Sequence, residues 1–292
     1  MQILPFFRFH PKPLLLLLLL AGGRLCAAQT SLNGTWAFRT DPANVGESRG
    51  WFQPGLSTAE WDSPGVDTLP VPGNWDLRNE YAHYVGRGWY RRTFATPAGA
   101  RGNITRLRFE AVYHDCTVWL NGQKLGENHS GFLPFEFEIS EKLAPNGPNT
   151  LVVCADNTLT RGAIWNWGGI RRPVTLEVTS PVRVVRQHVT PTVNLAAGTA
   201  EVAVRVFLQN HGPQPVAAKG EVVISAKNGV RKIAPFSAEL PANSSQSVLV
   251  KTSFSKAETH LWHFDDPFLY ESTVNLTPGP SPAERGETRS GF

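Results

Sequence analysis

Apolar and polar residues alternate along most of the chain beyond residue 30, with a period of two rather than the 3.6 of a helix. In RLRFEA (106–111) and PFEFEI (134–139), charged and apolar side chains alternate. VTLEV (174–178) follows the same rule. A strand with one buried and one solvated face produces this pattern, because successive side chains point to opposite faces. The sequence therefore predicts an all-β fold.

Turn signals divide these strands into two domains. Asn121-Gly122 follows the apolar run 118–120 and predicts a tight turn, since both residues tolerate positive φ. After a break at Ser180-Pro181 the amino-acid composition changes, with fewer tryptophans and more runs of β-branched residues. Further strands are predicted at 201–206, 221–224, 247–250 and 270–276. Short strands with turns every ~8–12 residues are typical of an immunoglobulin-like sandwich, here predicted for 181–276.

Residues 1–28 are predicted to be a signal peptide, which leaves 29–180 as the first domain. Basic residues precede an unbroken leucine run at 14–20, and Cys26-Ala27-Ala28 is a small-residue cleavage site. The alternative, a membrane anchor, is disfavoured because the apolar run is too short to cross a core of ~30 Å. We therefore expect cleavage after Ala28, a secreted or periplasmic product, and no membrane contact after cleavage.

The tail at 277–292 has a different character. It begins with a proline-rich stretch that cannot contribute a full set of ladder hydrogen bonds, and its remaining residues are polar and without a period. We expect it to be disordered or foreign to the domain, as in a truncated or frame-shifted gene product. The second sandwich would then lack a strand and expose an unpaired edge, which favours aggregation.

Composition narrows the function classes. The net charge of +4 falls to about +1 without the leader, because Arg8, Lys12 and Arg24 lie in it and no acidic residue does. No basic patch indicates nucleic acid. Cys116 and Cys154 lie in strand-like runs and are either a disulfide or two buried thiols. No Cys/His spacing suggests zinc, and no cofactor is expected.

Six ordered motifs in the first domain carry a family resemblance. They are LNGTWAF (32–38), VPGNWD (71–76), GWYRRTF (88–94), RLRFEAVYHDCTVWLNG (106–122), NHSGFLPFEFEIS (128–140) and NWGGIRRPVTLEV (166–178). A seventh, LWHFDDPFLY (261–270), lies in the second domain. In this order they resemble the sugar-binding jelly roll (galactose-binding-like) and the immunoglobulin-like domain of glycoside hydrolase family 2, over about residues 30–276.

The resemblance implies a larger enzyme. In this family a (β/α)₈ barrel follows the two β domains, carries two catalytic glutamates and cleaves β-glycosides with retention. A barrel needs about 200–250 residues, and only the short tail follows Leu276. We therefore predict an inactive N-terminal part of a secreted β-galactosidase-, β-glucuronidase- or β-mannosidase-like enzyme, whose partner is a β-linked carbohydrate. The alternative is a stand-alone carbohydrate-binding sandwich. The oligomeric state stays open.

The segment 161–167 is the favoured candidate site. In galactosidase- and glucuronidase-like members this region reaches the active site, and an acidic residue three places before the position of Asn166 holds the sugar. Ala163 stands there, which leaves the choice of sugar open. Trp165 and Trp167 are candidates for stacking on a pyranose face, with packing at the domain interface as the alternative.

Three further positions complete the candidate set. Gly169 and Arg172 match the family's Gly-Ile-x-Arg signature, and Arg172 is expected to have a structural role at the domain junction. His129, in a predicted loop, is a weaker candidate for ligand contact. The pair Asn79-Glu80 resembles a catalytic acid/base motif but lies in a jelly-roll loop, so we assign Glu80 to the surface.

Overall fold

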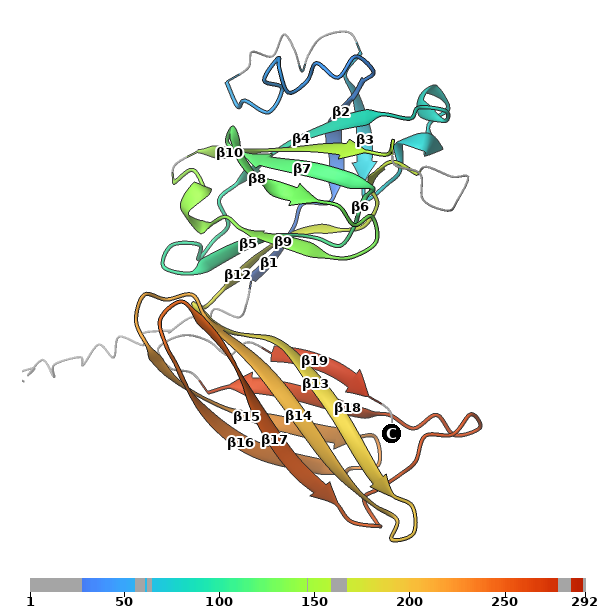
Figure 1. Ribbon diagram of the computed structural model, residues 1–292, viewed down its shortest axis with the longest axis vertical. Coiled ribbons are helices and arrows are strands. Elements are labelled where there is room, and N and C mark those ends of the chain that lie inside the picture. The colour runs from blue at the N-terminus through green and yellow to red at the C-terminus, as the bar shows by residue number, and fades with distance from the viewer. Residues whose placement is uncertain are drawn as a thin grey trace, which may run out of the picture.

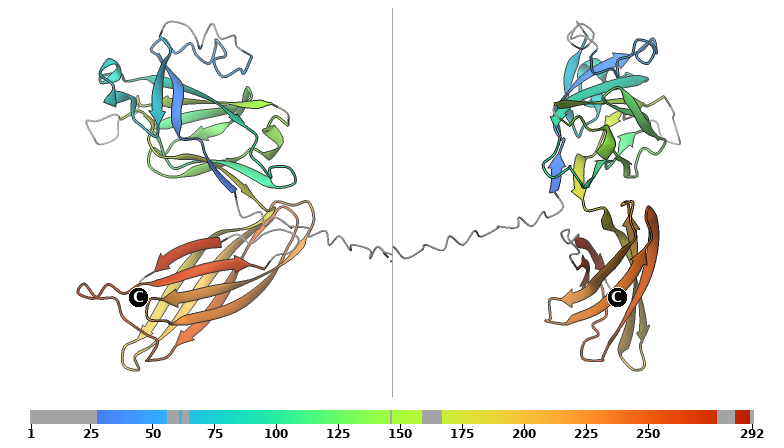
Figure 2. Two further views of the ribbon diagram at one scale, coloured as in Figure 1. Left: turned by 180° about the vertical axis from the view of Figure 1, so that it is seen from behind. Right: turned by 90° about the vertical axis from the view of Figure 1, so that its left-hand side faces the viewer.

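The computed structural model describes residues 28–55, 61, 65–145, 147–158, 167–277 and 285–290, with the backbone alone for Ala28 and 285–290. Two β-sandwiches follow one another along the long axis (Figure 1). Seen from the side, each sandwich consists of layered sheets, and the molecule is narrow where the two sandwiches meet (Figure 2). The all-β prediction is confirmed, because almost all regular structure consists of antiparallel strands.

Two main sheets form the first sandwich. One has the strand order β3-β2-β4-β10-β7-β8, the other β1-β12-β5-β9, and β11 pairs with β6 beside them. Three 3₁₀ turns, η1, η2 and η3, connect strands. The bounds are β1 Ala28–Ser31, β2 Gly34–Asp41, β3 Asp67–Val71, η1 Trp75–Leu77, η2 Asn79–Tyr81, β4 Arg87–Ala95, β5 Ile104–Phe109, β6 Val112–Tyr113, β7 Asp115–Leu120, β8 Gln123–Asn128, β9 Phe135–Glu138, η3 Ser140–Lys142, β10 Pro148–Asp156, β11 Gly169–Ile170 and β12 Val174–Thr179.

The alternating pattern places one apolar core between the two main sheets. Leu107 of β5, Val118 of β7 and Leu176 of β12 are fully buried there. The predicted turn at Asn121-Gly122 joins β7 to β8, and both residues have positive φ, at 52° and 82°. A second apolar cluster lies on the outer face of the larger sheet. There Trp51 and Trp61 pack with Trp89, Trp119, Val152 and Cys154.

The second sandwich packs a sheet of order β13-β14-β17 against one of order β16-β15-β18-β19. The bounds are β13 Val182–Asn194, β14 Thr199–Asn210, β15 Val216–Ala226, β16 Arg231–Leu240, β17 Ser244–Phe254, β18 Tyr270–Leu276 and β19 Arg285–Ser290. In β14, Val202, Val204, Val206 and Leu208 are buried and the residues between them are more exposed. This is the pattern that predicted the strand from the sequence.

The tail prediction needs a correction. Residues 285–290, which we expected to be disordered or foreign, form β19 and pair antiparallel with β18, from Tyr270↔Ser290 to Asn275↔Arg285. The strand that we expected to be missing is therefore present. The physical reason is that the edge of β18 offers unpaired backbone groups, which a strand of any side-chain composition can satisfy.

Only Ser180 and Pro181 separate β12 from β13, so the two sandwiches lie close together at this point. Charged side chains from both sandwiches meet there. Arg183 of β13 donates from Nη2 to Glu136 Oε1 of β9 at 2.6 Å. His211 Nδ1 lies 3.1 Å from Glu138 Oε2, also on β9. Arg106 of β5 lies with its Nε 3.7 Å from Glu136 and is 1 % exposed. We call these five side chains the junction cluster.

Arg172 is not part of the junction cluster. Its side chain is exposed just before β12, at the end of that strand remote from Thr179 and the second domain. Its backbone N–H donates to Ala111 O. The structural role predicted for Arg172 at the junction is carried instead by Arg106 and Arg183, whose side chains project from the strands that meet there.

The two cysteines are both free and buried. Cys116 packs in the core between the sheets, whereas Cys154 packs with the tryptophans on the outer face. Burial raises the pKa of Cys116 to about 12, so this thiol stays protonated and unreactive at neutral pH. Among the described residues no helix has the length and apolarity to cross a bilayer.

Candidate functional site

The candidate site begins where the VPGNWD loop packs against Gly168 and Gly169. Trp75 N donates to Gly168 O at 3.0 Å, and Gly73 N donates to Ile170 O at 2.8 Å. A Cβ on Gly168 would lie 1.9 Å from Trp75 Cζ2. Gly169 has φ of +132°, and a Cβ there would lie 2.7 Å from Tyr90 Oη. Two glycines in succession therefore allow the backbone to pass directly over the buried Trp75.

On either side of these glycines, Trp167 and Arg171 project to the surface together. The Arg171 guanidinium lies over the Trp167 ring, 4.9 Å from its centroid. It also lies 5.5 Å from the ring centroids of Tyr113 and of Phe132. Trp167 is 38 % exposed and Phe132 58 % exposed. These four side chains form what we call the arginine–aromatic cluster.

Asp76 lies close to this cluster. Burial raises the pKa of Asp76, although hydrogen bonds from the backbone of Asp76 and Gly168 and the charge of Arg171 act in the opposite direction. Its Oδ1 atom is buried and has no hydrogen-bond partner among the described residues. This carboxyl is therefore partly desolvated, which favours its protonated form relative to an ordinary aspartate.

A second feature is a polar cavity of about 190 Å³ on the outer face of the larger sheet. It lies over the ends of β4, β10, β7 and β8, where Arg87, Asp156, Asp115 and Glu127 project from neighbouring strands. His129, just beyond β8, forms part of its rim. Thr117, Trp89 and Trp119 also line it.

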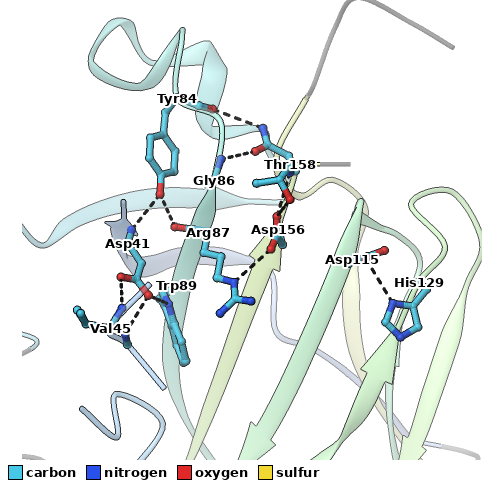
Figure 3. A network of polar contacts seen from close by, with 12 residues as sticks. Asp41, Val45, Tyr84, Gly86, Arg87, Trp89, Asp115, His129, Asp156 and Thr158 are labelled. Atoms are coloured by element: carbon cyan, nitrogen blue, oxygen red, sulfur yellow. Dashed lines mark hydrogen bonds and ion pairs between the residues drawn. The ribbon is translucent and has the colours of Figure 1, made fainter. Parts of the chain in front are cut away.

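Two of the four carboxylates that line the polar cavity, Asp156 and Glu127, have hydrogen-bond partners that shift their pKa values. Asp156 accepts from Arg87 Nε at 3.2 Å and from Thr158 Oγ1 at 2.6 Å (Figure 3). Burial acts to raise the pKa of Asp156, but the hydrogen bonds from Thr158 and Arg87 outweigh it, so this pKa lies below its usual range. The hydrogen bond from Lys124 lowers the pKa of Glu127 in the same way. Both groups are ionised at neutral pH.

Beside the cavity, buried hydrogen bonds fix the start of β4 (Figure 3). Tyr84 donates its hydroxyl to Arg87 O at 2.8 Å and accepts from Asp41 N at 3.0 Å. The Asp41 carboxylate accepts from Trp89 Nε1 at 3.1 Å and from two backbone N–H groups of the following loop, Val45 and Gly46. These hydrogen bonds fix the backbone at Arg87, and the contact with Asp156 orients its side chain.

The structure separates the candidates that the sequence suggested. Trp165 and Asn166 lie outside the described residues. Trp167 belongs to the arginine–aromatic cluster. His129 does not, because its ring lies between Asp115 Oδ2 at 3.4 Å and Glu127 Oε2 at 3.5 Å, at the polar cavity. Glu80 is on the surface, 3.6 Å from Arg78, as predicted.

Sequence reasoning missed Arg171, Phe132 and the pair Arg87–Asp156. The signature drew attention to Arg172, which follows Arg171 directly. A usable signal was present, because Ile170 is an obvious core residue and the side chain after it must point the other way. The pairing of Arg87 with Asp156 depends on strand register and left no local signal.

Comparison with known families gives the same division of the chain. Residues 79–181 match the sugar binding domain of glycosyl hydrolases family 2, and residues 182–292 match a second domain of that family. The chain belongs to glycosyl hydrolase family 2. The part of the chain that the structure describes contains both β domains and no (β/α)₈ barrel.

Family 2 relatives extend well beyond this chain. A β-galactosidase of Bacteroides ovatus is 24% identical over 280 residues, which cover 90% of this chain and 31% of that protein. A β-glucuronidase of Paenibacillus borealis is 29% identical over 180 residues, 51% of this chain and 29% of that protein. The chain spans about a quarter to a third of the length of the curated relatives it matches.

Solved structures show the same architecture. The β-glucuronidase of Bacteroides uniformis superposes with a TM-score of 0.78 at 21% identity, covering 91% of this chain and 32% of that one. At this identity the likeness establishes the fold. The likeness extends over both sandwiches and not only over the first.

Proposed function

We propose that this chain is the non-catalytic front part of a secreted family 2 glycosidase acting on β-glucuronides, β-galactosides or similar β-linked sugars, and that it does not hydrolyse them on its own. The family membership, with relatives that are glucuronidases and galactosidases, supports the substrate class. The observation that carries the inactivity is the state of Asp156 and Glu127, two carboxyl groups of the polar cavity.

A retaining glycosidase needs two carboxyl groups about 5–5.5 Å apart, one ionised and the other kept neutral by a raised pKa. In the polar cavity Asp156 and Glu127 have lowered pKa values and are engaged by Arg87, Thr158 and Lys124. Neither can serve as a general acid near neutral pH. Asp76, whose pKa is raised, has no carboxylate partner among its contacts in the described residues.

Exposed apolar side chains support a role within a larger assembly. In the first sandwich Leu77, Phe132 and Leu133 are exposed, and in the second Trp262 and Phe264 are exposed, Phe264 by 86 %. The loop before β4 and the loop between β17 and β18 project to the same side, at the right of Figure 1 and the left of the left view of Figure 2. Exposed apolar groups that lie together mark surfaces that another protein covers, and Trp262 and Phe264 are such a pair, with ring centroids 5.1 Å apart.

Export is the second part of the proposal. Cleavage after Ala28 would remove one residue of β1 and leave Gln29, Thr30 and Ser31 paired with β12. The first sandwich would therefore keep its edge strand in the mature protein. Intact-mass measurement of the protein from the periplasm or the culture medium tests this, because a species that begins at Gln29 is expected, and a mass that retains residues 1–28 would contradict export.

The inactivity is tested with nitrophenyl β-glucuronide, β-galactoside and β-mannoside. We expect the purified chain to release nitrophenol no faster than buffer. Asp156→Asn and Glu80→Gln serve as paired variants, one in the cavity and one on the surface. Release by the wild type that Asp156→Asn abolishes and Glu80→Gln leaves intact would overturn the proposal.

A stand-alone carbohydrate-binding protein is the second candidate, and the exposed ring of Trp167 favours it. An indole face can pack against the apolar C–H face of a pyranose without any bond being cleaved. Binding of a sugar by this chain, in the absence of hydrolysis, is compatible with both functions. Gene neighbourhood and translation of the downstream DNA separate them, because a barrel encoded in frame supports the first.

A further inference from the structure

We infer that Arg171 binds the carboxylate of an acidic sugar, with Trp167 and Phe132 flanking the sugar ring. The inference rests on the proposed carbohydrate-binding role and makes it more specific, because it selects uronic acids over neutral hexoses. Its evidence is the geometry of the arginine–aromatic cluster.

The charge of Arg171 has no carboxylate at ion-pair distance among the described residues. Arg87, Arg108 and Arg183 each have one, at 3.2, 2.7 and 2.6 Å. Arg171 instead has three ring contacts, and Asp76 acts on it only through space. An arginine held in place but not neutralised is suited to receive an anion.

The ring contacts also determine which part of Arg171 is available. A guanidinium that stacks on aromatic rings uses its flat faces, whereas its N–H donors lie in its plane and point outward from the edges. Those donors form a fork that matches the two oxygens of a carboxylate. The ring contacts of Arg171, at 4.9 Å from Trp167 and 5.5 Å from Tyr113 and Phe132, hold the guanidinium without supplying an acceptor for its N–H donors.

The flanking rings favour a sugar over a simple carboxylate. Trp167 and Phe132 remain substantially exposed next to the guanidinium. The C–H face of a pyranose can cover such rings and remove apolar surface from water, which acetate or a short dicarboxylate cannot do to the same extent. A hexuronic acid combines the ring and the carboxylate in one small molecule.

The test is titration of the full chain with methyl β-D-glucuronide, methyl β-D-glucoside and acetate, followed by tryptophan fluorescence and by NMR of the indole N–H signals. A charge-assisted bidentate contact predicts that the glucuronide binds about tenfold more tightly than the glucoside, with acetate weaker than the glucuronide. Equal affinity for the glucuronide and the glucoside would overturn the assignment of Arg171 and leave the carbohydrate-binding role standing.

Variants provide the control. Arg171→Gln is expected to lose about tenfold in glucuronide affinity and to leave the weaker glucoside binding unchanged, and Arg171→Lys is expected to lose less. Arg172→Gln removes the neighbouring exposed arginine and should change neither affinity. Thermal unfolding of each variant checks that it is folded.

Two further results contradict the inference. One is an Arg172→Gln variant that loses as much affinity as Arg171→Gln, since this would indicate a general charge effect. The other is no binding of either sugar by the wild type up to the solubility of the ligand. The hydrolysis assay is independent of both, so the proposed lack of activity can stand or fail separately.

Discussion

Two adjacent glycines determine how the candidate site is built. Gly168 and Gly169 let the strand that follows Trp167 lie against the buried Trp75, and the ring of Trp75 fills the space that a side chain would need. Trp167 and Arg171 stand at the two ends of this close contact. The orientation of the arginine–aromatic cluster therefore depends on a backbone contact that no other residue type permits.

Replacing Gly168 by alanine tests this contact. The new Cβ would overlap Trp75, which cannot move because it is fully buried. We expect Gly168→Ala to lower the free energy of unfolding by about 1–3 kcal/mol, measured by urea denaturation. Gly147→Ala is the matched control, since a Cβ there meets nothing within 4 Å and the change should be within about 0.5 kcal/mol. Equal losses in the two variants would contradict this account.

The candidate residues show what local sequence can and cannot predict. Gly169 was identified from its signature, and its positive φ explains the requirement for glycine. His129 was identified as a loop residue, but its neighbours Asp115 and Glu127 were not, because they come together through the pairing of β7 with β8. The sequence therefore identified single candidate residues, but it did not show which residues of different strands lie close together.

Three strands of the second sandwich, β14, β15 and β18, lie in the middle of a sheet, and the sequence predicted all three together with the edge strand β17. β14 and β18 are paired on both sides, and their alternation is regular. β13 and β16 are edge strands that were missed. Each contains a proline, Pro191 and Pro235, and most of their residues are partly exposed. A strand at an edge needs neither a strict pattern nor a full set of N–H donors, so its sequence carries less information.

β19 is the edge strand with the clearest consequence. It covers the free edge of β18 along six residue pairs although its own sequence is polar. We expect a chain that ends at Thr277 to aggregate faster than the full chain in light-scattering measurements, because the exposed edge of β18 can then pair with another molecule. A chain shortened by residues 291–292 alone is the control and should behave like the full one. Identical aggregation of the two shortened chains would argue against a protective role for β19.

At the scale of the whole molecule, the junction cluster connects two sandwiches that otherwise share a short linker. Its charges balance, because the two arginines Arg106 and Arg183 are matched by the two carboxylates of Glu136 and Glu138. Burial and the nearby Arg106 lower the pKa of His211, more than Glu138 and Glu136 raise it. The neutral form of His211 is therefore the one that the folded state prefers.

This preference predicts a dependence of stability on pH. The pKa of His211 is lower in the folded state than its ordinary 6.5, so the folded state binds fewer protons than the unfolded state. Its contribution to stability is fully present above pH 6.5 and is lost as the pH falls below that value. Urea denaturation at about pH 7.5 and about pH 5.5 should show a larger loss in the free energy of unfolding for the wild type than for His211→Gln.

His263→Gln, on an exposed loop, is the control and should behave as the wild type does. A wild type whose stability is the same at both pH values would contradict the assignment.

We propose that this family 2 chain is a non-catalytic front part and that it contains no nucleophile that attacks a β-glycoside. The most direct measurement is intact-protein mass spectrometry after incubation with cyclophellitol-6-carboxylate aziridine, a reagent that binds covalently to a β-glucuronidase of Bacteroides uniformis. We predict that the mass of this chain stays unchanged, while a complete family 2 β-glucuronidase treated in parallel gains one equivalent. A stoichiometric adduct on a carboxylate of this chain would show that it carries a catalytic nucleophile and would contradict the account.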